Sequence, residues 1–143
     1  MGRMSVFLAA LWWGGISAIS FIAVPVLFGQ LGNPALAGTV AAKLFSIQSI
    51  GVFGIALALL ASQRVRGGRR LLLMLALAVG AALAQEFVIA PHILQARAMG
   101  ESVRTWHSLG TLLILVQWLL GGAVLFDLLQ LQHHAKPSAR DGG

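Results

Sequence analysis

The sequence contains no cysteine, and charged residues make up only 10% of its 143 positions. The absence of cysteine excludes disulfide bonds, thiolate metal sites, iron–sulfur clusters and a cysteine nucleophile. Soluble domains carry about a quarter charged residues, so the scarcity of charge argues against a water-soluble core. Acidic residues number only four, and an acid inside an apolar segment is therefore conspicuous.

Hydrophobic residues, by contrast, make up 58% of the chain, and the mean hydropathy is +0.87. This composition predicts an integral membrane protein whose main partner is the lipid bilayer. The net charge of +6 comes from basic residues beside apolar segments, where they set orientation and meet anionic lipid headgroups. No basic patch is interleaved with stacking aromatic residues, so we expect no nucleic-acid partner.

Four apolar segments predict an all-α, integral membrane four-helix bundle, because each is long enough to cross roughly 30 Å of hydrocarbon. The first span carries a face of small residues that would let another helix approach closely, made of Gly14, Gly15, Ser17, Ala18 and Ser20. The first segment is too long for the apolar part of a signal peptide, so we expect it to be retained. One domain, residues 1–131, contains the predicted spans, at about residues 4–30, 41–61, 71–93 and 106–131, and a disordered cytoplasmic tail follows at 132–143.

The basic residues are unevenly distributed between the segments that join these spans. Short loops rich in Lys and Arg stay in the cytoplasm. If both termini are cytoplasmic, the outer segments hold only Lys43, Arg97 and Arg104. The inner segments then hold the other basic residues, Arg3, Arg64, Arg66, Arg69, Arg70, Lys136 and Arg140. The bias therefore predicts a multi-pass protein with cytoplasmic N and C termini.

An internal repeat relates the two halves of the chain. Residues 21–28 read Phe-Ile-Ala-Val-Pro-Val-Leu-Phe and residues 87–94 read Phe-Val-Ile-Ala-Pro-His-Ile-Leu. Each half contains two spans, so the halves would form two helical hairpins that run in the same direction. Pro25 and Pro91 then lie near the outer face, where we expect them to act as hinges that bend or end their helices.

A carboxylate lies within the third span, at Glu86. It follows Leu71 by about 15 residues, which places it some 22 Å from the cytoplasmic edge, in the outer third of the bilayer. Ionisable residues at such depth are functional by default, and Glu86 would accept a proton or cation in an outward-opening cavity. The alternative is structural, with Glu86 protonated or hydrogen-bonded to Gln48, Gln85 or His107, where it would hold helices together. The predicted polar site comprises Glu86, His92, His107, Gln48 and Gln85.

The same region suggests a metal site. His92, His107, Glu86 and Met99 offer the mixed nitrogen, oxygen and thioether ligands that copper tolerates. The alternative is that both histidines are hydrated side chains at helix boundaries, because the spacing fixes no ligand geometry. The cofactor is therefore open, with copper or haem as the candidates.

Several short motifs resemble those of the uncharacterised bacterial relatives of eukaryotic transmembrane protein 205. They are Val24–Phe28, Ala37-Gly38 followed by Leu44-Phe45, Ala90-Pro91 and His107. That family is similar in architecture to the copper-resistance protein D superfamily, whose wider circle includes haem-binding membrane oxidases. The resemblance implies a four-helix protein of the bacterial inner (plasma) membrane, with links to metal or toxicant tolerance. The chain departs from the haem-binding relatives because no histidine precedes His92.

No Ser-His-Asp arrangement, glycine-rich phosphate loop or metalloprotease helix motif can be assembled from the spans, so we expect no enzymatic activity. The protein is expected to be an accessory subunit of a membrane complex, or a small transporter or tolerance protein with a polar site in the outer leaflet. Partners would be further copies of the chain or other membrane protein subunits. The alternative is a haem- or copper-handling membrane redox protein, which an absorption spectrum with metal analysis would identify.

Overall fold

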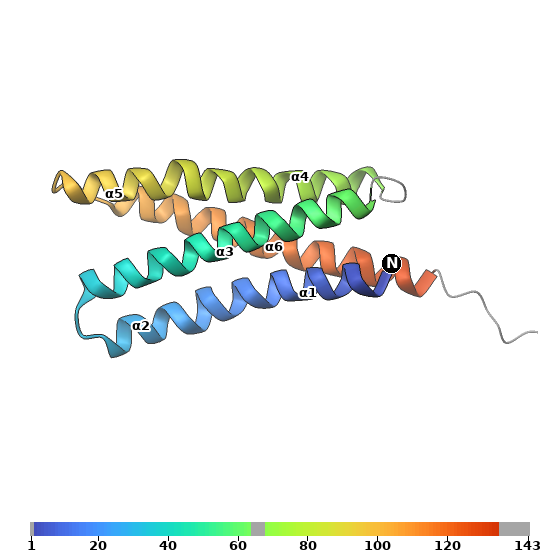
Figure 1. Ribbon diagram of the computed structural model, residues 1–143, viewed down its shortest axis with the longest axis horizontal. Helices are drawn as coiled ribbons and strands as arrows, with labels where there is room; N and C mark the ends of the chain where they lie inside the picture. Colours follow the sequence, from blue (N-terminus) through green and yellow to red (C-terminus); the bar gives the residue numbers. More distant parts are fainter. Residues whose placement is uncertain (1, 64–67, 135–143) are drawn as a thin grey trace, which may run out of the picture.

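The computed structural model describes residues 2–63 and 68–134, and all secondary structure in these ranges is helical. Four continuous helices are long and apolar enough to cross a membrane. They confirm the predicted all-α four-helix membrane bundle (Figure 1). The elements are α1 (Gly2–Ala18), the π-helical turn η1 (Ile19–Ala23), α2 (Val24–Gln30), α3 (Pro34–Gln63), α4 (Arg69–Ala84), the π-helical turn η2 (Gln85–Ile89), α5 (Ala90–Ala98) and α6 (Arg104–His134).

The helices extend beyond the predicted spans at most ends. The joining turns are limited to residues 31–33 and 99–103, which are shorter than the polar segments of the sequence. Helix α6 continues through His134, three residues into the predicted tail, and residues 135–143 lie outside the described part of the chain. Polar residues need not end a helix at the membrane surface, because helix ends are set by capping groups rather than by hydropathy.

Both turns contain such capping groups. Gly32 and Gly100 have positive φ angles of 57° and 69°, which glycine adopts without steric cost. Asn33 then caps α3, because its Oδ1 accepts hydrogen bonds from the N–H groups of Ala35 at 3.0 Å and Leu36 at 3.2 Å. These local bonds fix the two tight reversals that make the hairpins.

The two halves of the chain repeat one series of elements: a helix, a π-helical turn, a helix with proline in its first turn, a tight turn and a long helix. This order agrees with the parallel repeat that the sequence predicts. Proline has no N–H group, so Pro25 and Pro91 cannot donate the usual helical hydrogen bond. The widened turns just before them absorb this loss, with Val24 N–H donating to Ile19 and Ala90 N–H to Gln85. The helices therefore continue past both prolines instead of ending there.

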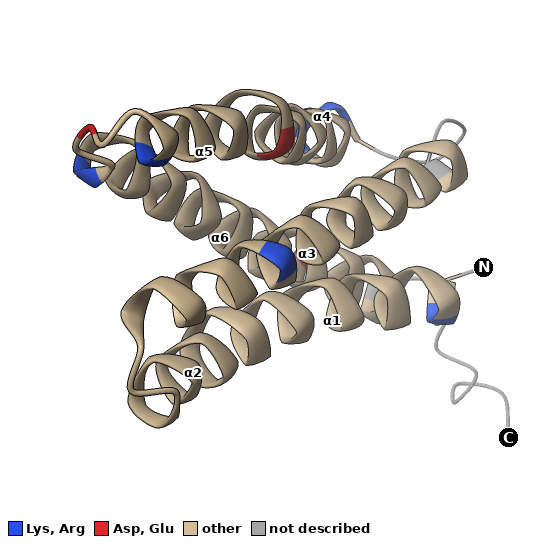
Figure 2. Ribbon diagram, turned by 60° about the vertical axis from the view of Figure 1, so that its left-hand side comes forward, with Lys and Arg blue, Asp and Glu red and all other residues tan. Residues whose placement is uncertain are grey.

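The bundle is packed tightly at one end and open at the other. The hydrophobic core includes Trp12, Ile16, Leu59, Leu75 and Val124, and it lies in the half that contains the start of α1, the end of α3, the start of α4 and the end of α6. We call this half the terminal end, and the half with turns 31–33 and 99–103 the turn end. The hairpin of α1, α2 and α3 and the hairpin of α4, α5 and α6 separate toward the turn end (Figures 1 and 2).

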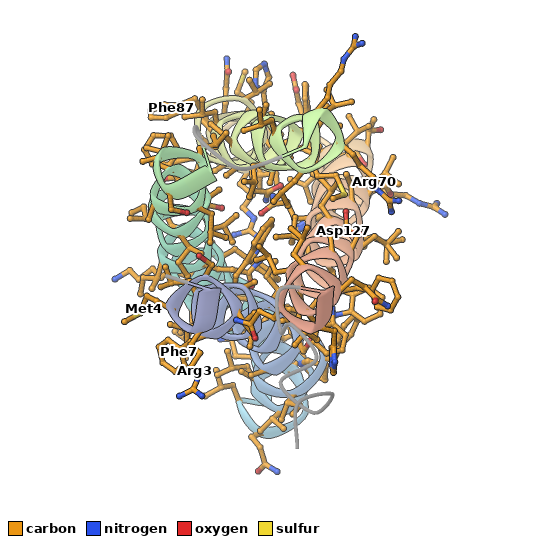
Figure 3. All side chains as sticks on the ribbon, turned by 90° about the vertical axis from the view of Figure 1, so that its right-hand side faces the viewer. Arg3, Met4, Phe7, Arg70, Phe87 and Asp127 are labelled. Carbon is orange, nitrogen blue, oxygen red and sulfur yellow. The ribbon has the colours of Figure 1, made fainter. Side chains whose placement is uncertain are left out.

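Large apolar side chains also cover the outside of the bundle. Phe7 is 61% exposed and Phe87 is 72% exposed, and both point away from the helices (Figure 3). Such a surface requires lipid as its solvent. The predicted small-residue face makes no close contact at Gly14 and Gly15, because no atom lies within 4 Å of a Cβ built on either residue, whereas Ser17 accepts a hydrogen bond from Trp118 of α6. The two bulky tryptophans beside them on α1 make the close contact instead, against glycines of α6.

Candidate functional site

A cavity of about 710 Å³ lies between the separated hairpins at the turn end, and all four spans contribute to its walls. Its lining is mostly apolar and includes the aromatic side chains of Phe21, Phe28, Phe45 and Trp118. The polar and charged residues that line it are Ser20, Thr39, Lys43, Ser46, Gln85, Glu86, Arg97, His107 and Thr111. The cavity is therefore an apolar chamber with a small number of polar groups, which is the usual composition of a ligand site.

Glu86 is the acidic residue of this lining, and Ser46 is its hydrogen-bond partner. The Ser46 hydroxyl donates to Glu86 Oε1 across 2.6 Å. Both residues lie 12 positions from the turn end of their helices, about 18 Å along the axis, so they meet at one depth. The predicted structural partners of Glu86 were Gln48, Gln85 and His107, and the structure assigns the contact to Ser46 instead.

Beside Glu86, Gln85 occupies the first position of the π-helical turn η2 and is only 8% exposed. Within the described ranges its side-chain Oε1 has no hydrogen-bond partner, and the same holds for the hydroxyl of Ser20 on the opposite hairpin. Gln48 is also buried, at 6% exposed, but it does not line the cavity. The cavity thus contains two polar groups that the protein itself does not satisfy, and such groups favour a bound partner.

One wall of the cavity is formed by Trp118, whose indole is held from two sides. Its Nε1–H donates to the Ser17 hydroxyl at 2.9 Å, and that hydroxyl donates to the Trp13 carbonyl at 2.8 Å. Phe21 meets the ring edge-on with centroids 5.7 Å apart, and Trp13 stacks on it at 5.7 Å. These contacts fix the aromatic wall in position before any ligand arrives.

Three basic side chains line the cavity nearer its mouth. Arg97 is the last residue but one of α5, and its Nη2 lies 2.9 Å from the position of a Cβ on Gly38 of α3. Arg97 therefore reaches across from one hairpin to the other, into space that only a glycine leaves free. His107 lies three residues into α6, and Lys43 lies one turn before Ser46 on α3.

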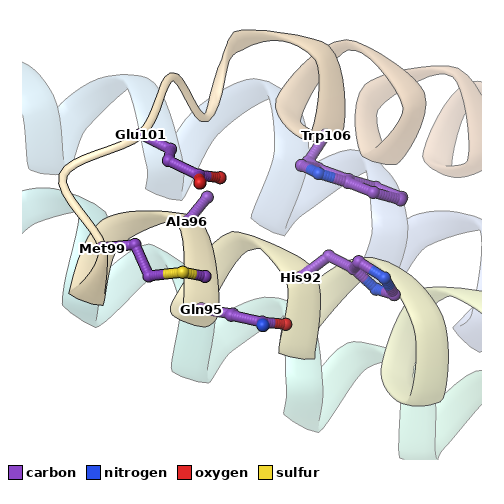
Figure 4. Close-up of a pocket in the computed structure, with 6 residues that line it drawn as sticks. All are labelled: His92, Gln95, Ala96, Met99, Glu101 and Trp106. Atoms are coloured by element: carbon purple, nitrogen blue, oxygen red, sulfur yellow. The ribbon is translucent and has the colours of Figure 1, made fainter.

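His92 and Met99 lie in a different place. They line a separate pocket of about 360 Å³ at the turn end, together with Gln95, Ala96, Glu101 and Trp106 (Figure 4). The His92 ring stacks on Trp106 with centroids 4.1 Å apart, and its Nδ1–H donates to the Val88 carbonyl at 2.6 Å. Trp106 and His107 are successive residues of one helix and point about 100° apart, so His92 meets the first of them and not the second.

The four predicted metal ligands are consequently divided. Glu86 and His107 line the larger cavity, whereas His92 and Met99 line the smaller pocket. Among the residues that the structure describes, no group of three or more His, Asp or Glu side chains could hold a metal ion. The geometry supports a polar site of Glu86, Gln85 and His107, without His92 and Gln48.

Sequence reasoning did not identify several residues of the cavity. Ser46 was not recognised as a site residue, because a lone serine in a membrane span usually forms a hydrogen bond with the backbone of its own helix. Ser20 could have been found from the repeat, since it precedes Phe21 as Glu86 precedes Phe87. The aromatic wall depends on which faces of α1 and α6 meet, and a helix that is apolar all round does not reveal this.

The family described as "Domain of unknown function (DUF4149)" matches residues 7–102, which is more than half of the chain. The match includes both prolines and Glu86 and ends before α6. No curated protein and no solved structure matches the chain. The resemblance to transmembrane protein 205 and to the copper-resistance protein D superfamily gains no support from the comparisons and stays a prediction. The chain therefore belongs to the DUF4149 family, a family of unknown function.

Proposed function

We propose that this protein is a non-enzymatic membrane protein that binds, and as a small transporter moves, a hydrophobic small molecule in the cavity between its two hairpins. The observation that carries the proposal is the cavity itself. Its volume of about 710 Å³ falls within the range of roughly 300–1,000 Å³ that small-molecule sites occupy. One chain supplies all of its walls, so binding needs no partner subunit.

The position of the cavity in the bundle supports movement of a ligand as well as binding. The terminal end is closed by packed side chains, including Trp12, Leu59 and Val124, which are at most 2% exposed. The turn end is open between the hairpins. A chamber open on one side and sealed on the other is one of the two states that an alternating-access transporter requires. The two parallel hairpins supply the bodies that would move against each other.

We also propose that the cavity opens toward the outside of a bacterial inner membrane, with both termini in the cytoplasm. Arg3, Arg69 and Arg70 lie at the terminal end in the structure. Orientation can be tested directly, because the natural chain contains no cysteine. A membrane-impermeant thiol reagent should label Ser102→Cys in intact cells and label His133→Cys only after lysis. The reverse pattern would invert the proposed orientation.

The proposed function is tested by filling the cavity. Ala90 lines it, so Ala90→Phe should displace any small molecule that remains bound to protein purified in lipid nanodiscs, as detected by native mass spectrometry. Ala76→Phe is the matched control, because Ala76 is exposed on α4 and adds its ring to the lipid-facing surface. Equal ligand content in both variants and the natural protein would refute the cavity as a binding site.

A further inference from the structure

Two side-chain acceptors lie next to each other in the lining of the cavity, on Glu86 and Gln85. Glu86 offers its carboxylate, of which Oε1 already accepts from Ser46. Gln85 Oε1 is buried in the same lining without a partner in the described part of the chain. An acceptor in this position is satisfied by a ligand that carries N–H groups or positive charge, and an anionic ligand would be repelled by the carboxylate.

Among the residues that the structure describes, no basic side chain forms an ion pair with the carboxylate of Glu86. Within 4 Å, the ion pair found in the described ranges is Arg70 with Asp127, far from the cavity at the terminal end. Lys43 is exposed and does not reach Glu86 within that distance. Glu86 is half-buried beside apolar walls, and a cation bound there would interact favourably with its carboxylate.

The aromatic lining fits the same kind of ligand. Phe21, Phe45 and Trp118 line the cavity with Glu86, and the Trp118 ring is fixed by Ser17 and Phe21. Aromatic faces attract cations through their quadrupole, and tryptophan does so most strongly. A carboxylate with aromatic walls is how proteins recognise organic ammonium ions.

Arg97 is placed where it leaves the inner part of the cavity free. Arg97 follows Glu86 by 11 residues, about 16 Å along the helix axis, and its guanidinium packs against Gly38. His107 lies near the start of α6, one helical turn before the place where this helix meets Gln85. Lys43 lies about one helical turn from Ser46 on α3, so its positive charge would compete with a bound cation.

From these contacts we infer that the occupant of the cavity is a lipophilic cation, held by Glu86 and Gln85 and enclosed by Phe21, Phe45 and Trp118. The inference rests on the proposed function and names its ligand class. It predicts that charge of one sign, and not hydrophobicity alone, determines what binds.

Two ions of closely matched shape and opposite charge test the inference. Tetraphenylphosphonium and tetraphenylborate binding would be measured on the full-length protein in nanodiscs of zwitterionic lipid, with empty nanodiscs subtracted. Tetraphenylphosphonium should bind and tetraphenylborate should not. Glu86→Gln, which keeps the side-chain shape and an acceptor for Ser46, should weaken phosphonium binding at least tenfold. Glu101→Gln is the control, because Glu101 lies in the turn and does not line the cavity.

A second variant checks the sign of the effect without touching Glu86. Lys43→Gln removes the competing positive charge and should tighten phosphonium binding severalfold. Phosphonium binding that is unchanged in Glu86→Gln, or weaker in Lys43→Gln, would overturn the inference. If tetraphenylborate binds in preference to tetraphenylphosphonium and Ala90→Phe abolishes that binding, the inference of a cationic ligand is overturned. The proposed function would then remain in place. If neither ion binds, the inference fails, and the ligand content of Ala90→Phe judges the proposed function separately.

Discussion

The contact between α1 and α6 predicts a specific loss of stability when Gly121 is replaced by alanine. A Cβ on Gly121 would lie 3.3 Å from Cε2 and 3.5 Å from Cδ2 of the Trp12 indole. Trp12 is 2% exposed and belongs to the hydrophobic core, so its ring has no free space into which to retreat. The helices must therefore move apart by a few tenths of an ångström, or the indole must leave its preferred rotamer.

The expected change in the free energy of unfolding is the difference between two opposing effects. Overpacking of a filled core costs about 1–3 kcal/mol. Replacing a helical glycine by alanine returns roughly 0.5–1 kcal/mol of backbone entropy. We therefore expect Gly121→Ala to lower the free energy of unfolding by about 0.5–2 kcal/mol. Gly122→Ala should cost less, because its neighbour Trp13 is 36% exposed and can shift toward lipid.

The assay is reversible unfolding of the purified protein in mixed micelles by SDS titration, followed by tryptophan fluorescence. Gly51→Ala is the matched control, since no atom lies within 4 Å of its Cβ position and the change should be neutral or stabilising. The difference between the two alanine variants isolates the contact with Trp12 from the helix propensity. Equal stability of Gly121→Ala and Gly51→Ala would refute the packing of α1 against α6.

Three further predictions concern single contacts. Ser46→Ala removes the hydrogen bond to Glu86 and should weaken tetraphenylphosphonium binding about threefold to tenfold, because such a bond contributes about 1 kcal/mol. Binding as tight as that of the natural protein would contradict a role for this contact in the site. Asp127→Asn breaks the 3.3 Å ion pair with Arg70, whose side chain is 75% exposed. SDS titration should therefore show that the free energy of unfolding falls by at most about 1 kcal/mol, and by less in high salt. A larger fall would mean that the pair is better shielded from solvent than the structure indicates. His92→Ala removes a ring that stacks on Trp106 outside the cavity, so phosphonium binding should stay unchanged. A substantial decrease in binding would mean that the two pockets act as one site.

The structure brings some residues of the predicted site together and separates others, for physical reasons that differ between residues. Glu86 was identified because a carboxylate in an apolar span is costly wherever the span packs. Its partner Ser46 was not identified, since that contact joins residues 40 positions apart and depends on the rotation of α3 against the third span. The metal set of His92, His107, Glu86 and Met99 treated closeness in sequence as closeness in space. Helix geometry separates it, because the ring of His92 meets Trp106 and His107 faces the other cavity.

The sequence by itself determined that this protein lies in lipid, that it crosses the bilayer four times and that its two halves follow one plan. These properties depend on hydropathy and on local backbone preferences, such as those of Gly32 and Gly100 in the turns. Each segment of the chain has these preferences independently of the segments that it packs against. Only the tertiary structure decided that the bundle is closed at one end and hollow at the other. Hydrophobicity does not decide which apolar helices pack together in lipid. Close contacts such as Gly121 with Trp12 determine where the helices meet and where they separate, and these contacts exist only in the folded protein.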